Sequence, residues 1–274
     1  MSRRTTPNVI GGLASTIWLA IVVLPVYYVL ITSLRRQSAF YTENPLSFPS
    51  HATFDNYRLV WESGFLRYLA NSAIVTLASV AAVLALAVTA AYVVVRSRSA
   101  AAGRIFSVFL LGIAIPIQAT IIPVYYMVMR LRLYDTLAAL ILPSVAFAIP
   151  LTVLILVNFM RDIPGELFES MWLDGAGDRR LLFNLVLPLT RPALVTVAVY
   201  DALTVWNGFL FPLILTQSAD KRTLPLSLWT FQGQFMINIP AVLAAVVLSA
   251  IPLLAAYAVG RRQLVQGITA GFGK

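Results

Sequence analysis

Carboxylates occur at two places in this 274-residue sequence where their spacing or setting could support chemistry. Asp174 and Asp178 lie four residues apart, which on a helix places two carboxylates on one face, as a metal site or an acid–base pair requires. Arg179 and Arg180 follow immediately, so a surface that faces water or a partner is the favoured interpretation. Asp201 is different, because it lies inside an apolar run, where a carboxyl group is costly and indicates a function.

Other catalytic patterns are missing from the sequence. It contains no phosphate-binding G-x-x-x-x-G-K-[ST], no Gly-x-Ser-x-Gly and no HExxH. The one histidine, His51, stands in a polar stretch, and there is no cysteine, which excludes disulfides and thiolate metal sites. We therefore expect no catalytic residue, no metal and no cofactor on this chain, and no ATP hydrolysis by it alone.

The composition indicates an integral membrane protein. Hydrophobic residues make up 59% of the chain, charged residues only 11%, and the mean hydropathy is +0.84; a soluble domain has about 25% charged residues. A net charge of +9 would suggest nucleic-acid binding in a soluble protein. Here the arginines cluster between apolar runs, so they predict membrane anchoring and topology, with no nucleic-acid partner.

Six apolar runs predict an all-α protein with about six transmembrane helices. The predicted spans are 13–34, 69–95, 105–129, 137–160, 193–215 and 240–259, within a membrane domain of residues 13–260. A short segment, 1–12, precedes them and a tail, 261–274, follows. With the amino terminus inside, twelve of the 20 Lys and Arg residues lie in inner segments and eight outside, so we expect both termini in the cytoplasm.

The third span carries candidates for a solute pathway. We expect Pro116 and Pro123 to break its helix twice, and backbone groups freed at membrane depth are tolerated where they line a cavity or are buried in protein. Gln118, Tyr125 and Tyr126 are then candidate pathway residues. Hydrogen bonding of these side chains to neighbouring helices is an equally open alternative.

The fifth span adds Asp201, Trp206 and Asn207 to the candidate pathway residues. Asp201 lies only about two helical turns after Pro192. Since the span is expected to begin there, Asp201 could lie near the cytoplasmic interface.

Between the fourth and fifth spans lies a charged segment, 162–192, with the pattern of a short docking element. Pro164 suits a first helical turn, and Gly175 permits a turn that a residue with a Cβ would resist. A second helical segment, Asp178 to Leu187, is expected to stop at Pro188. The pattern is therefore helix, glycine turn, helix and proline stop.

This segment resembles the EAA loop of bacterial ABC importer permeases. The family pattern is Glu-Ala-Ala, three residues, Gly, nine residues, then Ile-x-Leu-Pro. Ser170 and Met171 replace the two alanines and Leu185 replaces the isoleucine, which preserves helix-forming or apolar character. The residues that match by type and spacing are Glu169, Asp174, Gly175, Ala176, Leu187 and Pro188.

Two further stretches resemble the carbohydrate-importer subgroup of these permeases. The run WNGFLFPLIL at 206–215 follows its usual Trp-Asn-x-Phe-Leu-x-Pro. The tail at 261–274 is similar to the Gly-Leu-Thr-Ala-Gly tail of the second permease in maltose-type importers, with Ile268 in place of leucine. Together the similarities cover nearly the whole chain.

The resemblance implies a type I permease fold in a bacterial cytoplasmic membrane, with the docking element serving as a coupling helix. Glu169 would pair with a basic group on a cytoplasmic ATPase, Gly175 would set the turn, and Met171 and Leu173 would fill the ATPase cleft. The implied coupling residues are Glu169, Met171, Leu173, Asp174, Gly175, Ala176 and Pro188. The implied tail contacts to the ATPase are Gly267, Thr269 and Gly271.

The resemblance also implies the partners and the transported solute. They are a homologous second permease, two ATPase subunits that bind ATP and magnesium, an extracellular solute-binding protein and a sugar. An ABC permease for another small solute, such as an amino acid, phosphate or a polyol, is one alternative. An ion-driven secondary transporter with Asp201 as proton carrier is another. A membrane-embedded enzyme would need clustered polar residues at membrane depth, and the sequence has only scattered ones.

Overall fold

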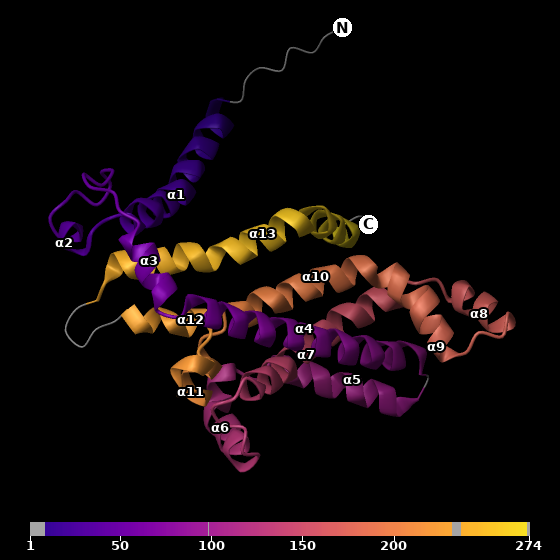
Figure 1. The fold of residues 1–274 in the computed structure, drawn as a ribbon. Helices are drawn as coiled ribbons and strands as arrows, with labels where there is room; N and C mark the ends of the chain where they lie inside the picture. Colours follow the sequence, from indigo (N-terminus) through magenta and orange to yellow (C-terminus); the bar gives the residue numbers. More distant parts are fainter. Residues whose placement is uncertain (1–8, 98, 232–236, 273–274) are drawn as a thin grey trace, which may run out of the picture. The chain divides into compact units, whose positions relative to one another are not determined.

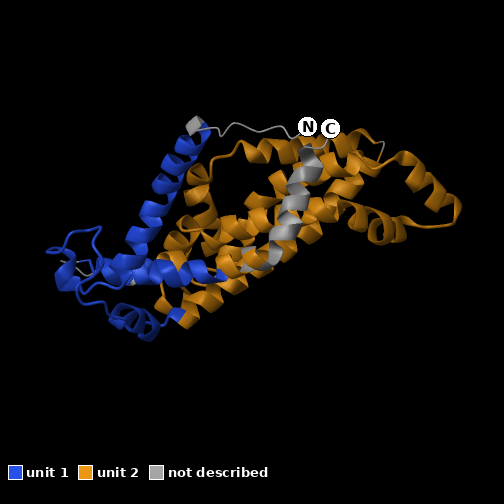
Figure 2. Ribbon diagram, turned by 90° about the horizontal axis from the view of Figure 1, so that it is seen from above, with its two compact units in different colours: residues 1–65, 228–252 blue, residues 66–227, 253–274 orange. Residues whose placement is uncertain are grey.

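The computed structural model describes residues 9–97, 99–231 and 237–272. Helices make up most of this part of the chain, and it contains no β-strand (Figure 1), which confirms the predicted all-α fold. The chain divides into two compact units, residues 1–65 with 228–252 and residues 66–227 with 253–274 (Figure 2).

The first unit contains a long apolar helix and a compact polar loop. Its helices are α1 (Val9–Ser33), α2 (Gln37–Phe40), α3 (Asp55–Glu62), the 3-10 turn η4 (Leu228–Phe231) and the first part of α13 (Ile239–Phe272). Arg35, only 1% exposed, organises the loop between α1 and α3. Its guanidinium donates to the carbonyl oxygens of Asn44, at 2.9 Å, and Ser47, and lies 3.3 Å from the carboxylate of Glu43.

The second unit holds the remaining helices. They are α4 (Phe65–Arg96), α5 (Ala100–Ile113), η1 (Ile117–Thr120), α6 (Ile121–Arg130), α7 (Ala138–Arg161), α8 (Gly165–Leu173), α9 (Asp178–Leu181), the π turn η2 (Leu182–Val186), α10 (Leu187–Trp206), α11 (Leu210–Leu215), η3 (Ala219–Lys221) and α12 (Leu224–Ser227). Its main core is formed by α4, α7 and α10, where Ala87, Ala91, Val153, Val157 and Ala193 are almost fully buried. Small and β-branched side chains allow helices to approach closely in a membrane protein.

Four helices of the described chain are long and apolar enough to cross a membrane: Gly11–Ser33, Phe65–Arg96, Ala138–Arg161 and Asp178–Trp206. A fifth span arises if the bent pair Ala100–Ile113 and Ile117–Arg130 crosses as one, and a shorter apolar helix covers Ile239–Ala255. All six predicted apolar runs are therefore mainly helical. The runs at 13–34, 69–95 and 137–160 form long, unbroken helices, whereas the run at 193–215 is interrupted after Trp206.

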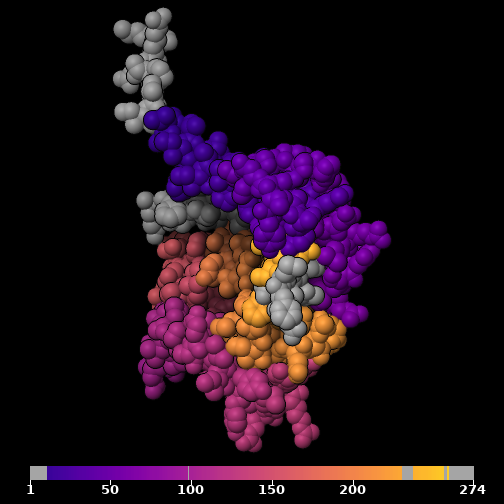
Figure 3. Space-filling model, turned by 90° about the vertical axis from the view of Figure 1, so that its left-hand side faces the viewer, coloured from indigo at the N-terminus to yellow at the C-terminus, as the bar shows by residue number. Residues whose placement is uncertain are grey.

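The third apolar run is bent by 98° instead of forming a straight span. The helix ends at Ile113, and Pro116 precedes the 3-10 turn that leads into α6. The predicted second break at Pro123 is wrong, because Pro123 lies in the first turn of α6, where helical N–H groups have no intrahelical acceptor. As a result, α6 projects from the rest of the second unit (Figures 1 and 3).

The fifth apolar run begins earlier than predicted. The expected helix stop at Pro188 is wrong, because the chain continues from α9 through the π turn directly into α10. A π turn is wider than an α turn, and it makes room for a proline ring that would otherwise clash with the preceding turn. Pro188 thus starts α10, Pro192 lies within it, and the actual break follows Trp206.

Candidate functional site

The segment between α7 and α10 forms a helix, a tight turn and a second helix. Pro164 precedes α8, and the turn that follows it is closed by two backbone hydrogen bonds, from Gly175 N–H to Trp172 at 3.0 Å and from Ala176 N–H to Met171 at 3.0 Å. Gly175 has a φ of +78°, a left-handed conformation that strongly favours glycine. In Figure 1, α8 and α9 lie at the end of the unit where α4 ends and α10 begins. We call residues 164–181 the coupling segment.

The inner face of the coupling segment packs into the core of the second unit. Phe168 and Ala176 are each 4% exposed and Leu181 is fully buried, all in contact with the core formed by α4, α7 and α10. Met171 packs against the same core and is half-buried. Because two helices and their turn each contribute a buried side chain, the segment is fixed as one body to the membrane helices.

Two contacts attach the coupling segment to the last turns of α4. The Tyr92 hydroxyl donates to Oδ1 of Asp178 at 2.8 Å, and the Arg96 guanidinium lies 4.6 Å from the centre of the Phe168 ring. A cation above an aromatic face is attractive. The coupling segment is therefore joined to α4 by a hydrogen bond on α9 and a cation–π contact on α8.

The outer face of the coupling segment is apolar and acidic. Leu173 is 90% exposed and Trp172 is 66% exposed. Glu169, one turn earlier, is exposed, and within the described residues its carboxylate has no hydrogen bond or ion pair. Large exposed apolar side chains beside an unpaired charge are typical of a protein-binding surface.

The structure divides the predicted coupling residues between these two faces. Glu169, Leu173, Asp174 and Gly175 are exposed, as is Pro188 at the start of α10. Ala176 is buried, and Met171, which we expected to fill a partner's cleft with Leu173, is half-buried against the chain's own core with part of its side chain still exposed.

Sequence reasoning missed several residues of this segment. The exposed Trp172 was recognisable from its neighbour Leu173, since both are large apolar residues in a charged segment. The contact between Tyr92 and Asp178 joins residues 86 positions apart and has no sequence signal.

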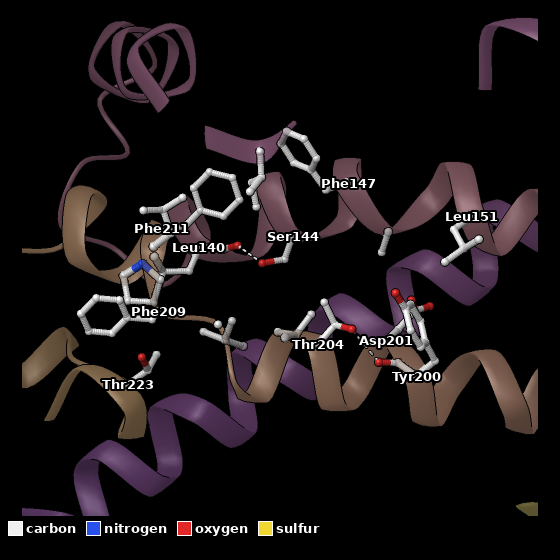
Figure 4. A pocket seen from close by; sticks show the side chains of 17 residues that line it. Leu140, Ser144, Phe147, Leu151, Tyr200, Asp201, Thr204, Phe209, Phe211 and Thr223 are labelled. Carbon is white, nitrogen blue, oxygen red and sulfur yellow. Dashed lines mark hydrogen bonds between the residues drawn. The ribbon is translucent and has the colours of Figure 1, made fainter. Parts of the chain in front are cut away.

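A cavity of about 210 Å³ lies inside the second unit, between α7, α10 and α11 (Figure 4). Tyr200 and Asp201 stand at one end of the view, and Phe209, Phe211 and Thr223 at the other. Ser144 and Phe147 of α7 and Thr204 of α10 line the space between them. Apolar walls with a few polar groups are typical of a site for a small molecule.

Asp201 is the one carboxylate among the described residues that line this cavity. It is 1% exposed, and its Oδ2 accepts a hydrogen bond from Thr152 Oγ1 at 2.9 Å. Asp201 lies 14 residues after Leu187, the first residue of α10, which at 1.5 Å per residue is about 21 Å along that helix. Its partner Thr152 lies nine residues before Arg161, the last residue of α7, which is about 14 Å along that helix. Asp201 is thus further from the start of its helix than a helix start at Pro192 implied, and its depth in the membrane stays a prediction.

The other candidate pathway residues do not line the cavity. Gln118 is exposed on η1, next to the cavity residue Ile117. The Tyr125 ring packs edge-on against Tyr134 at 5.8 Å, and the Tyr126 hydroxyl accepts from Arg130.

Trp206 and Asn207 close the end of α10. Trp206 is 9% exposed, and Asn207 Nδ2 donates to the Leu203 carbonyl at 2.8 Å. Asn207 therefore caps the helix at the point where the chain turns towards the cavity wall. The tail residues Gly267, Thr269 and Gly271 lie in the last turns of α13, outside the residues whose side chains the structure describes.

Comparison with known proteins places this chain in a family. The family model described as binding-protein-dependent transport system inner membrane component matches residues 83–268, which include the coupling segment and most of the cavity. A putative ABC transporter permease protein (ORF2) from Caldicellulosiruptor sp. (strain Rt8B.4) is 40% identical, covering 93% of both chains. The diacetylchitobiose uptake system permease protein NgcG of Streptomyces coelicolor is 32% identical, covering 93% of this chain and 85% of that one.

A solved structure has the same fold. The crystal structure of a bacterial ABC transporter involved in import of the acidic polysaccharide alginate contains a chain that superposes with a TM-score of 0.82. The match covers 93% of this chain and 95% of that chain, at 21% identity. This similarity confirms the ABC importer permease fold.

Proposed function

Since the chain belongs to the family of binding-protein-dependent transport system inner membrane components, we propose that it is the transmembrane subunit of an ATP-driven sugar importer. The observation that carries this proposal is the coupling segment. It presents Glu169, Trp172 and Leu173 outward while Phe168, Ala176 and Leu181 fix it to the transmembrane helices. A rigid, exposed helix of this kind suits the transmission of movement from a partner to the membrane domain.

The substrate class rests on the relatives. Besides the diacetylchitobiose permease, a probable starch degradation products transport system permease protein, AmyC of Thermoanaerobacterium thermosulfurigenes, is 27% identical over 96% of this chain. Both of these proteins are named for carbohydrate uptake. The WNGFLFPLIL run of this chain, which forms the end of α10 and α11, supports the same class.

We assign ATP hydrolysis to partners. Two cytoplasmic ATPase subunits would bind ATP and magnesium, a homologous second permease would complete the pathway, and an extracellular binding protein would deliver the sugar. This arrangement requires the coupling segment and both termini to face the cytoplasm. The tail residues Gly267, Thr269 and Gly271 are proposed to touch the ATPase as well.

The coupling segment provides a mechanical route from the ATPase to the membrane helices. A partner that moves Leu173 and Glu169 would also move Phe168, because both helices of the segment are packed as one body. The cation–π contact of Phe168 with Arg96 and the hydrogen bond of Asp178 with Tyr92 then pass the displacement to α4. Since α4, α7 and α10 share one core, the cavity between α7 and α10 is displaced with them.

Purification of the tagged chain tests these assignments. The chain would be expressed with its genomic neighbours, extracted in mild detergent, and its bound proteins identified by mass spectrometry. Recovery of an ATPase and a second permease in fixed proportion is expected. A stable chain that is recovered alone and carries solute in vesicles without ATP would refute the proposal and favour ion-driven transport through Asp201.

A further inference from the structure

The polar side of the membrane cavity combines three groups that offer hydrogen-bond acceptors, Ser144, Thr204 and Asp201, with the hydroxyls of Tyr200 and Thr223, which can also donate. The Ser144 hydroxyl donates to the Leu140 carbonyl at 2.7 Å, and the Thr204 hydroxyl donates to the Tyr200 carbonyl at 2.9 Å (Figure 4). Each hydroxyl hydrogen is therefore used within its own helix. What these groups offer to the cavity is oxygen lone pairs.

Asp201 adds the strongest acceptor. Only its Oδ2 has a hydrogen-bond partner, the Thr152 hydroxyl, and no ion pair to Asp201 occurs among the residues that the structure describes. A carboxylate accepts up to four hydrogen bonds, and hydrogen bonds to charged groups are the stronger ones. A buried carboxylate with one partner is costly unless a further donor satisfies it.

Thr223 is a second unsatisfied group in the cavity wall. It is 5% exposed, and its Oγ1 has no hydrogen-bond partner. Buried hydroxyls in folded proteins nearly always have a partner. Among the described residues, the cavity thus has a carboxylate oxygen without a protein partner, Oδ1 of Asp201, in one wall and a buried hydroxyl without a partner in another.

The remainder of the wall is aromatic. Phe147 and Phe211 lie with ring centres 5.7 Å apart at an angle of 44°, and Phe209 adds a third ring. No Arg, Lys or His side chain is among the described residues that line the cavity. An anionic solute would therefore meet a carboxylate and no compensating cation, which is strongly unfavourable in a buried site.

We propose that this cavity binds one neutral sugar ring, whose hydroxyls donate to Asp201, Ser144 and Thr204 while its C–H face packs on Phe147 and Phe211. A sugar carries hydroxyl donors around its edge and apolar C–H groups on its faces, which matches acceptors in one part of the wall and aromatic rings in the other. This assignment rests on the proposed function and deepens it. It places a binding site for the transported sugar in this subunit and excludes acidic sugars from that site.

A thiol-protection experiment tests the site directly. The sequence has no cysteine, so Ala148→Cys places the chain's single thiol in the cavity wall. The complete transporter, in detergent, would be treated with a water-soluble maleimide, and labelling of this subunit measured by mass spectrometry. The probes are maltose, cellobiose, N,N′-diacetylchitobiose, glucosamine and glucuronate. Gln217→Cys, exposed on a loop outside the cavity, is the control and should be labelled equally with every probe.

The proposal predicts that at least one of the three neutral sugars slows labelling of Cys at 148, whereas glucuronate does not. Asp201→Asn in the same background keeps an oxygen that accepts from Thr152 but removes the charge. The concentration of sugar that gives half-protection should then rise about fivefold to tenfold, because a hydrogen bond to a neutral acceptor is weaker than one to a carboxylate. Thermal stability should not fall, because Asn keeps the bond to Thr152 and removes a buried charge, and this separates binding from a merely structural role.

Several results would overturn the proposal. One is that the thiol at position 148 is not labelled in the absence of sugar. Others are that glucuronate protects it as well as a neutral sugar does, or that glucosamine alone protects it. The last is that Asp201→Asn leaves the sugar concentration for half-protection unchanged. ATP-driven uptake of a neutral sugar by the same preparation, without protection at position 148, would refute this site and leave the proposed function intact. Uptake of solute that proceeds without ATP would refute the proposed function, whatever the protection at position 148.

Discussion

Replacement of Leu173 by serine should detach the ATPase without unfolding the membrane domain. Complete burial of a leucine side chain contributes about 1.5–3 kcal/mol to an interaction. Since 90% of Leu173 is exposed, almost all of that contribution is available to a partner. Its removal should raise the dissociation constant of the ATPase about 10-fold to 100-fold, because each 1.4 kcal/mol corresponds to about a factor of ten.

The effect on folding should be small. Substitutions at exposed positions usually change stability by less than about 0.5 kcal/mol. Ser170→Ala is the matched control, because Ser170 is exposed on the same helix and its hydroxyl bonds only the Leu167 carbonyl, within α8. The control should bind the ATPase as tightly as the native chain does.

The assay is equilibrium binding of the purified ATPase to the immobilised permease pair in detergent, with ATP-driven uptake in proteoliposomes as a second measurement. Leu173→Ser should lose binding and uptake together while its thermal unfolding midpoint stays unchanged. Unaltered ATPase affinity would show that the outer face of the coupling segment is not the docking surface. A matching loss in Ser170→Ala would show that the effect is not specific to the apolar side chain.

Three further predictions concern the turn at Gly175, the contact between Tyr92 and Asp178, and the loop at Asp135. Gly175→Ala should destabilise the turn by about 1–2 kcal/mol, since alanine resists a left-handed backbone. Gly177→Ala is the control and should not, because Gly177 has a φ of −80° and equally open space for a Cβ. The thermal unfolding midpoint and the affinity for the ATPase, measured for both variants, test this difference. Tyr92→Phe and Asp178→Asn should show a coupling energy of about 1 kcal/mol in a double-mutant cycle on unfolding, and additive effects would refute the contact. The Ser218 hydroxyl and the N–H groups of residues 217 and 218 lower the pKa of Asp135 below its usual value. Deprotonated Asp135 thus stabilises the loop above its unfolded pKa of about 3.9, and this stability is lost as the pH falls through the lower folded pKa. Asp135→Asn should therefore speed proteolysis of the loop at pH 7, and equal rates for both proteins at that pH would contradict the assignment.

The fold could be predicted from the sequence because long apolar runs leave little choice. Every predicted apolar run is mainly helical, although the third is bent and the fifth is interrupted after Trp206, and Gly175 adopts the left-handed turn that its position in the motif required. Helix ends were harder to predict where proline occurs. Pro188 is accommodated by a π turn and Pro123 by a first helical turn, and neither feature has a sequence signature.

The candidate sites were predictable only in part. The exposed face of the coupling segment follows from helical periodicity and the motif, so Glu169 and Leu173 could be identified. Its attachment to α4 depends on Tyr92, Arg96 and Phe168, which meet only in three dimensions. The distance of Asp201 from the start of its helix was underestimated because the π turn lets the helix begin before Pro192.

The most direct test of the central claim is sugar uptake into proteoliposomes that contain the complete transporter, with binding protein outside the vesicles and ATP on the side of the ATPase. The account predicts uptake that requires ATP and binding protein, continues when the membrane potential and proton gradient are collapsed, and is lost in Leu173→Ser. Uptake that proceeds without ATP and stops when the ion gradients are collapsed would contradict it.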